Sequence, residues 1–279
     1  MDDALNSKRR AVAEEAARAA GAVHMRYYGT GIDRVTKAWR RDFVTRADLE
    51  AQAAVKDVIA AHFPHDLVIG EEDEDAFNRI AASIETGCWV TDPLDGTAEF
   101  LHTGTHFASV VSYIERGVAR AAAIHSPFSD ELYSAAWGQG ATLNGREIRT
   151  SGATRLDDAM FVASYTAPTL ERAAWFGRWM QQVMPAVGGW RMFGSSAVCA
   201  ITIAAGRADL YAPPTEEDPA DPRLGPPHHP QPWETPAYVL IVQEAGGAVS
   251  DVRGGAPDLL GFNVYAASRA LLDEYLALL

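Results

Sequence analysis

Asp92 and Asp95 stand just after an apolar segment, Cys88–Thr91, and a proline and a leucine separate them. The apolar segment predicts a buried strand, the proline is expected to stop its hydrogen-bonded ladder, and the Asp-Gly pair that follows favours a tight turn. Both carboxylates should therefore converge where the strand ends. Together with a backbone carbonyl such as that of Leu94, they supply the oxygen ligands that Mg²⁺ prefers, and we predict a divalent-cation site. The alternative is an ordinary Asp-Gly turn that caps a helix.

A second apolar strand, Asp66–Gly70, runs into Glu71 and Glu72. Because strand ends in one sheet often lie side by side, Glu71 can meet Asp92 and Asp95. Carboxylates crowded in this way repel one another unless a cation lies between them. The alternative is a solvated Gly-Glu-Glu loop.

The elements that must position these acids differ between the two halves of the chain. In the first half, residues 4–28 form an amphipathic pattern, and a capping box from Thr45 to Asp48 begins a second helix that reaches Phe63. Short strands follow, at Asp66–Gly70, Cys88–Thr91, Ala108–Ile114, Arg120–His125 and Glu131–Trp137. This order predicts helices followed by a largely antiparallel sheet.

Beyond about Ser151 strands and helices alternate, which is typical of an α/β half. We expect strands near Phe161–Ser164, Val187–Arg191, Ala208–Tyr211, Val249 and Val264, and helices near Leu170–Met184, Ser195–Ala205, Thr235–Ala245 and from Ser268. We therefore divide the chain into residues 1–150 and 151–279. Nine of the 15 prolines lie between Pro213 and Pro236, which predicts a long surface loop.

The composition, with 48% hydrophobic and 22% charged residues, is that of a globular protein and excludes disordered, collagen-like and coiled-coil classes. A formal net charge of −13 argues against nucleic-acid binding and against a polybasic membrane surface. Cys88 and Cys199 stand in apolar surroundings without metal-ligand spacing, so we expect two buried free thiols in a reducing compartment. The charged N-terminal segment and the short apolar runs predict a cytoplasmic protein without a membrane segment.

Several segments in a fixed order extend these observations to nearly the whole chain. They are Asp42-Phe43-Val44-Thr45, Gly70-Glu71-Glu72, Asp92-Pro93-Leu94-Asp95-Gly96-Thr97, Gly194-Ser195-Ser196, and Pro232-Trp233-Glu234 running into Glu244-Ala245-Gly246-Gly247. In these segments the chain resembles the inositol monophosphatase family of lithium-sensitive, metal-dependent phosphatases, which includes bisphosphate nucleotidases and relatives of fructose bisphosphatase. The resemblance implies an αβαβα layered sandwich in which an α+β half meets an α/β half at the active site. It also implies a homodimer.

The resemblance further implies a role for each matching residue. Ligands of the first metal would be Glu71, Asp92 and the Leu94 carbonyl, those of the second Asp92, Asp95 and Glu234, and Asp42 would help to bind a weaker additional ion, giving two or three Mg²⁺ per active site. The catalytic residues would be Glu71, Thr97 and Asp95, with Glu71 and Thr97 orienting and deprotonating the attacking water. The substrate would be contacted by Gly96, Thr97, Gly194, Ser195, Ser196 and Glu234, with backbone N–H groups of the turn directed at the phosphate.

One position departs from the family pattern, because Trp233 is followed by Glu234 where the family has aspartate. The extra methylene shifts the carboxylate by about 1.5 Å, whereas catalytic geometries tolerate only about 0.5 Å. Glu234 can still bind the second metal after a small helix shift, or the second site can be weak. In a further alternative a loop acid replaces it, namely Glu216, Glu217, Asp218 or Asp221.

We therefore predict a Mg²⁺-dependent phosphatase that hydrolyses a small phosphorylated alcohol, such as an inositol, sugar or nucleotide phosphate, by metal-activated water. One alternative is a narrow-specificity biosynthetic phosphatase that uses the altered position 234 and the loop 213–232 to accept an unusual intermediate. Another is a diverged member that binds a phosphorylated ligand without turnover.

Overall fold

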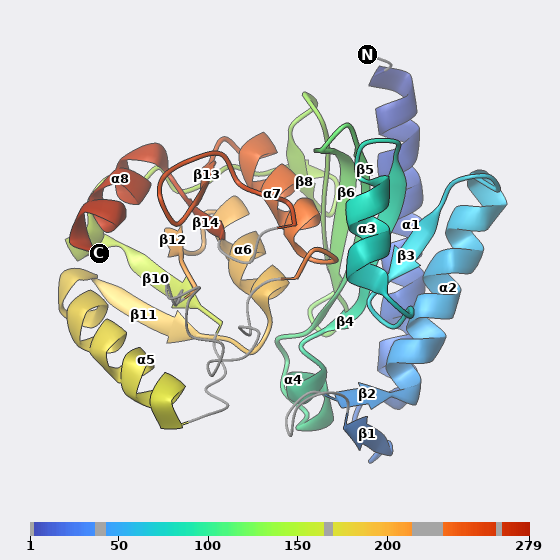
Figure 1. The fold of residues 1–279 in the computed structure, drawn as a ribbon, viewed down its shortest axis with the longest axis horizontal. Helices are drawn as coiled ribbons and strands as arrows, with labels where there is room; N and C mark the ends of the chain where they lie inside the picture. Colours follow the sequence, from blue (N-terminus) through green and yellow to red (C-terminus); the bar gives the residue numbers. More distant parts are fainter. Residues whose placement is uncertain (1–2, 37–42, 165–169, 214–230, 261–263) are drawn as a thin grey trace.

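The structure, a computed structural model, describes residues 3–36, 43–164, 170–213, 231–260 and 264–279. Two β-sheets alternate with three layers of helices, in the order helix, sheet, helix, sheet, helix (Figure 1). This is the αβαβα sandwich that the family resemblance implies, and the prediction is confirmed. No helix in the described ranges is both long enough and apolar enough to cross a membrane.

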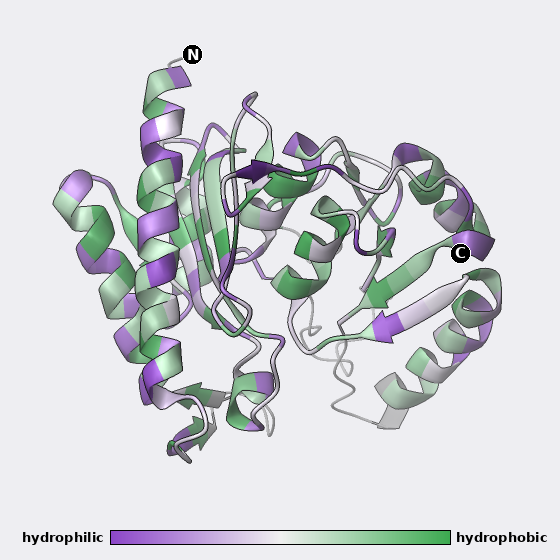
Figure 2. Ribbon diagram, turned by 180° about the vertical axis from the view of Figure 1, so that it is seen from behind, coloured by the Kyte–Doolittle hydropathy of each residue, from purple (hydrophilic) through white to green (hydrophobic). Residues whose placement is uncertain are grey.

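The first layer consists of α1 (Asp3–Tyr27) and α2 (Arg46–His62). In α1 a stripe of small apolar residues, including Ala13, Ala16 and Ala20, is fully buried and packs against the sheet. The predicted capping box begins α2: the Thr45 hydroxyl accepts the Ala47 N–H, and the side chain of the third helical residue accepts the Thr45 N–H. Figure 2 shows hydrophilic and hydrophobic residues alternating along both helices, as expected for helices that cover one face of a sheet.

The second layer is a seven-stranded sheet in the order β3-β4-β5-β6-β7-β8-β9. Its strands are β3 (Val68–Gly70), β4 (Cys88–Asp95), β5 (Ala108–Glu115), β6 (Val118–Ser126), β7 (Glu131–Ala136), β8 (Ala141–Leu143) and β9 (Arg146–Glu147). Only the β3–β4 pair within this sheet is parallel, so the predicted antiparallel character is confirmed. A separate antiparallel pair joins β1 (Arg34–Thr36) to β2 (Phe43–Thr45).

The middle layer contains α6 (Ser196–Ala204) and α7 (Thr235–Glu244), which pack against both sheets. Almost every residue of these two helices is buried, and their sequences are correspondingly apolar on all sides. On the same face of the first sheet, α3 (Ala76–Ser83) places Ile80 against Ile69 and Val90. The short helix α4 (Thr97–Leu101) follows β4 directly.

The second sheet has five strands in the order β11-β10-β12-β14-β13, with parallel and antiparallel pairs. The strands are β10 (Met160–Ala163), β11 (Gly189–Met192), β12 (Leu210–Tyr211), β13 (Ala248–Asp251) and β14 (Val264–Ala267). The outer helices are α5 (Leu170–Val183) and α8 (Arg269–Leu278), with 3-10 turns at Leu156–Asp158 and Met184–Ala186. The Trp179 indole N–H of α5 donates to the Tyr275 hydroxyl of α8 at 3.2 Å.

One prediction about the strand before the acids is wrong. Pro93 does not stop the ladder: β4 continues to Asp95, and its pairing with β5 resumes after a shift of register. The proline is tolerated because it lies in the irregular stretch between two paired residues, where its missing N–H is not needed. Cys88 and Cys199 are buried free thiols, as predicted.

Candidate active site

A β-bulge in β4 brings Asp92 and Asp95 to one face of the first sheet. Residues three apart on a regular strand point to opposite faces. Here Asp92 pairs with Val110 and Asp95 with Ala108, so β4 carries one more residue than β5 between these pairs. The extra residue reverses the alternation. Both carboxylates therefore face the middle helical layer, on the same side as Val90.

Glu71 follows β3, which runs parallel to β4, and its N–H donates to the Thr91 carbonyl at 3.0 Å. This pairing places Glu71 beside Asp92, and the neighbouring Glu71 carboxylate helps to raise the pKa of Asp92. The predicted meeting of acids at two neighbouring strand ends is thus observed.

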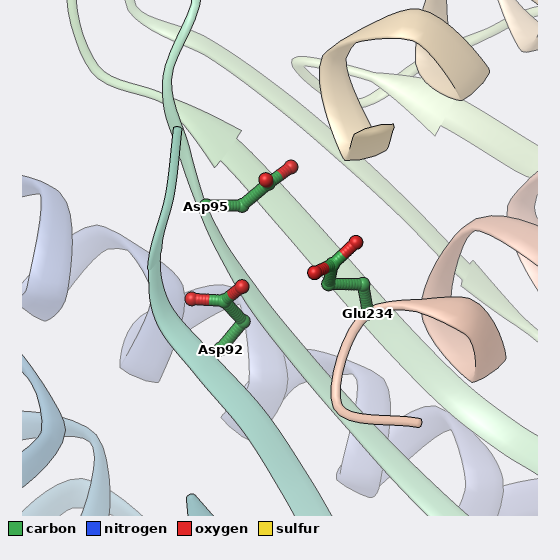
Figure 3. A group of neighbouring side chains, drawn as sticks. All are labelled: Asp92, Asp95 and Glu234. Carbon is green, nitrogen blue, oxygen red and sulfur yellow. The ribbon is translucent and has the colours of Figure 1, made fainter. Parts of the chain in front are cut away.

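Glu234 approaches the same point from the other half of the chain. It immediately precedes α7, and its N–H donates to the Gln231 carbonyl at 2.9 Å. Pro236 lies in the first turn of α7, where its missing N–H costs nothing. The longer side chain does reach the aspartates: one carboxylate oxygen from each of Asp92, Asp95 and Glu234 lies within 4.8 Å of the others (Figure 3).

The three carboxylates are nearly inaccessible to solvent, with exposed fractions of 2% for Asp92, 7% for Asp95 and 8% for Glu234. Burial, together with the neighbouring acids, raises the pKa of Asp92 and of Glu234 well above their usual values. Burial also raises the pKa of Asp95, to about 6, although hydrogen bonds from Ser195 and Ala197 oppose the rise. The fold thus brings several carboxylates together in a place where burial makes their ionised forms unfavourable.

The N-terminus of α6 binds the Asp95 carboxylate. Asp95 Oδ2 accepts the Ser195 hydroxyl at 2.5 Å and the Ala197 N–H at 2.8 Å, and Ser195 Oγ in turn caps the helix by accepting the Val198 N–H at 3.1 Å. An anion at a helix N-terminus is stabilised by the unpaired N–H groups and by the helix dipole. The neighbouring Ser196 hydroxyl donates to Glu234.

Thr97 is connected to an acid that the sequence does not single out for chemistry. The Thr97 hydroxyl lies 3.1 Å from Asp48 Oδ1 and 3.0 Å from the Leu94 carbonyl oxygen. Asp48 is fully buried, and its other oxygen accepts both the N–H and the hydroxyl of Thr45. From the sequence, Asp48 is explained completely by the capping box; only the packing of α2 beside β4 brings it to Thr97.

The bulged part of β4 that carries the aspartates is also anchored from α1. The imidazole of His24 is fully buried, and its Nε2 lies 2.8 Å from the Pro93 carbonyl oxygen, so a neutral ring can donate to it. Burial lowers the pKa of His24 to about 3, which keeps the ring neutral. His24 packs edge-on against Phe107 and close to Phe100.

The two predicted glycines lie where a side chain would clash. Gly96 has φ +89°, and a Cβ there would lie 2.9 Å from the His106 carbonyl oxygen. A Cβ on Gly194 would lie 2.3 Å from Glu99 Oε1. The predicted ligand Asp42 and the loop acids Glu216, Glu217, Asp218 and Asp221, with most of the loop 213–232, lie outside the described residues.

The donor set fits a hard divalent cation. Its ligands would be carboxylate oxygens, and none of the ion pairs among the described residues supplies a cation to Asp92, Asp95 or Glu234. Buried carboxylates without a compensating positive charge are strongly unfavourable. A Mg²⁺ ion, which accepts carboxylates and water in octahedral array, would remove this cost.

Comparisons with known proteins agree with this arrangement. Residues 5–279 match the sequence model of the inositol monophosphatase family. "Nus factor SuhB" of Escherichia coli is 31% identical over 268 residues, 95% of this chain and 93% of the relative. "Inositol-1-monophosphatase" of Rhizobium meliloti is 34% identical over 221 residues, 78% of this chain and 75% of the relative.

Solved structures resemble the whole chain. The extragenic suppressor protein suhB from Bartonella henselae superposes with a TM-score of 0.82 at 29% identity, covering 96% of each chain. The Thermotoga maritima IMPase superposes with a TM-score of 0.79 at 26% identity, covering 95% of this chain and 94% of the other. By sequence and by fold, over nearly its full length, this chain belongs to the inositol monophosphatase family.

Proposed function

We propose that this protein is a Mg²⁺-dependent phosphatase that hydrolyses the phosphate monoester of a small alcohol, such as an inositol, sugar or nucleotide phosphate. The observation that carries the proposal is the buried group of Asp92, Asp95 and Glu234, with Glu71 beside Asp92. When bound there, Mg²⁺ would supply an activated water and neutralise the charge of the phosphate during in-line displacement.

The protein's own residues would divide the remaining work. The single Thr97 hydroxyl proton is directed to Asp48 or to the Leu94 carbonyl, so the Thr97 oxygen keeps lone pairs that can accept a hydrogen bond from the attacking water. Glu71, which lies beside Asp92, would take the proton of that water. The first N–H groups of α4, at Thr97 and Ala98, have no partner inside the helix and would bind phosphate oxygens.

Further parts of the proposal concern the number of bound ions, the oligomeric state and the cellular compartment. Glu71, Asp92 and the Leu94 carbonyl would bind one ion, Asp92, Asp95 and Glu234 a second, and Asp42 would help to bind a third. The family resemblance supports a homodimer, and the buried thiols of Cys88 and Cys199 fit a reducing compartment such as the cytoplasm.

A second candidate is a binding role without turnover. It is favoured by the Escherichia coli relative, which aligns with nearly the whole chain and is named as a factor and not as a phosphatase. Glu234, in place of the family's aspartate at a predicted ligand position, also favours a binding role without turnover.

Phosphate release distinguishes the two candidates. The protein would be incubated with inositol, sugar, histidinol and nucleotide phosphates, with Mg²⁺ and with EDTA, beside Asp95→Asn as the inactive control. Release that needs Mg²⁺ and that Asp95→Asn abolishes supports the phosphatase and identifies its leaving group. Folded protein that binds Mg²⁺ and releases no phosphate from any substrate supports the binding role.

A further inference from the structure

Two adjacent serines at the start of α6 donate to two different carboxylates of the buried cluster formed by Asp92, Asp95 and Glu234. Ser195 caps the helix and donates to Asp95 at 2.5 Å. Ser196 donates to Glu234 Oε2, and both of these residues are buried, with exposed fractions of 7% and 8%. Since Ser195 already caps α6, the Ser196 hydroxyl is not needed to begin the helix. Its partner is a side chain from a distant part of the chain.

Glu234 needs such a partner more than an aspartate would. A glutamate has an additional rotatable bond, and binding an ion with it costs more side-chain entropy. The backbone of Glu234 is fixed by its bond to the Gln231 carbonyl, but its carboxylate does not cap α7. One oxygen of the carboxylate accepts Ser196, and a Glu234 oxygen lies within 4.8 Å of the aspartate oxygens.

We propose that Ser196 is a positioning residue that adapts the longer Glu234 side chain to the cation site. Its hydroxyl fixes one carboxylate oxygen, so that the carboxylate is oriented toward the cation it shares with Asp92 and Asp95. Ser196 and Glu234 then form a matched pair: an aspartate at position 234, one methylene shorter, would not reach the same hydroxyl. This inference deepens the proposed function and rests on it only for the presence of the cation.

Mn²⁺ binding to the full-length protein tests the pair without requiring turnover. Free Mn²⁺ would be followed by electron paramagnetic resonance during titration of wild type, Ser196→Ala, Glu234→Asp and the double variant. We expect Ser196→Ala to weaken binding at the site about tenfold in the wild-type background and less than twofold in the Glu234→Asp background. Such non-additivity is the signature of two groups that act through each other.

Two further variants separate positioning from general damage. Ser196→Thr keeps the hydroxyl and should stay within about threefold of the wild-type Mn²⁺ affinity. Ser250→Ala is the matched control: Ser250 is also fully buried, in β13, but among the described residues its hydroxyl has no hydrogen-bond partner. It should leave Mn²⁺ binding unchanged.

Equal losses from Ser196→Ala in both backgrounds, or unchanged Mn²⁺ affinity in a folded Ser196→Ala protein, would overturn the inference. Phosphate release measured on the same samples separates it from the proposed function. Non-additive Mn²⁺ binding without phosphate release from any substrate refutes the phosphatase and leaves the pair standing. Mg²⁺-dependent release with additive Mn²⁺ binding refutes the pair alone.

Discussion

At the scale of single residues, the buried carboxylates of Asp92, Asp95 and Glu234 destabilise the folded state when no cation lies between them. In Asp95→Asn the side-chain oxygen can still accept the Ser195 hydroxyl and the Ala197 N–H, while one buried negative charge is removed. We expect this variant, in EDTA at pH 7.5, to have a free energy of unfolding about 2 kcal/mol higher than wild type, although it loses activity. Chemical denaturation measures the difference.

The pH dependence of that difference has a definite sign. The pKa of Asp95 is raised to about 6, so between pH 4 and 6 the folded state keeps a proton that the unfolded state has lost. The buried charge of Asp95 therefore costs the folded state nothing below pH 4, and this group lowers the free energy of unfolding of wild type as pH rises from 4 through 6. The advantage of Asp95→Asn should shrink toward zero at pH 4, and an equal or lower stability at pH 7.5 would contradict the assignment.

The Thr97 hydroxyl gives a prediction about turnover. Thr97→Val removes the hydroxyl that we assign to orienting the attacking water, and kcat should fall about 100-fold, because a misplaced reactant costs a rate factor of that order. Thr97→Ser keeps the hydroxyl and should retain most activity. Steady-state kinetics at saturating Mg²⁺ measures both, and near-wild-type kcat in Thr97→Val would remove Thr97 from the mechanism.

At the scale of elements, α1 stabilises the bulged part of β4 that carries the acids, through the bond between His24 and the Pro93 carbonyl. His24→Phe keeps the ring packing against Phe100 and Phe107 but leaves that carbonyl without its donor, which should cost about 1–2 kcal/mol at pH 7.5. Thermal or chemical denaturation measures the loss, and unchanged stability would show that the bond contributes nothing.

His24 also contributes a pH dependence opposite in sign to that of Asp95. Its pKa is lowered to about 3, so below about pH 6.5 the unfolded chain binds a proton that the folded protein excludes. Stability is therefore lost as pH falls from 6.5 toward 3, by about 1.4 kcal/mol per pH unit. In His24→Phe this part of the acid destabilisation should disappear. An unchanged slope between pH 6 and 4 would contradict it.

Most elements can be predicted from the sequence because their signals are local. The alanine stripe of α1, the capping box of α2 and the apolar strands before Glu71 and Asp92 each lie in one continuous segment. α3 escapes prediction, because its first turn has no side-chain cap and Asp75 before it is left-handed at φ 54°. The β4 bulge escapes as well, since it exists only in the register with β5.

The candidate site follows the same division. The proximity of Asp92 and Glu71 can be predicted because two neighbouring strands place them, whereas Asp95 joins them only through the β4 bulge. The contacts of Asp48 with Thr97 and of Ser196 with Glu234 cannot, because each joins elements whose distance is set by tertiary packing.

At the scale of the whole molecule, the proposed cation site joins the first sheet to the middle helical layer through side chains. Asp92 and Asp95 belong to the first sheet, and Glu234 precedes α7 in the middle layer. Because a ligand that binds only the folded state stabilises it, Mg²⁺ at 100 times its dissociation constant should add about 2.7 kcal/mol. The thermal midpoint should rise with Mg²⁺ in wild type and much less in Glu234→Ala; equal rises in both would contradict a role for Glu234.

The β4 bulge and the later position of Glu234 in the chain separate the parts of the proposed cation site in the order of synthesis. The two aspartates are translated, and can be aligned by strand pairing, well before α7 exists. During synthesis, β4 can therefore pair with β5 before Glu234, which would complete the proposed cation site, has been added to the chain.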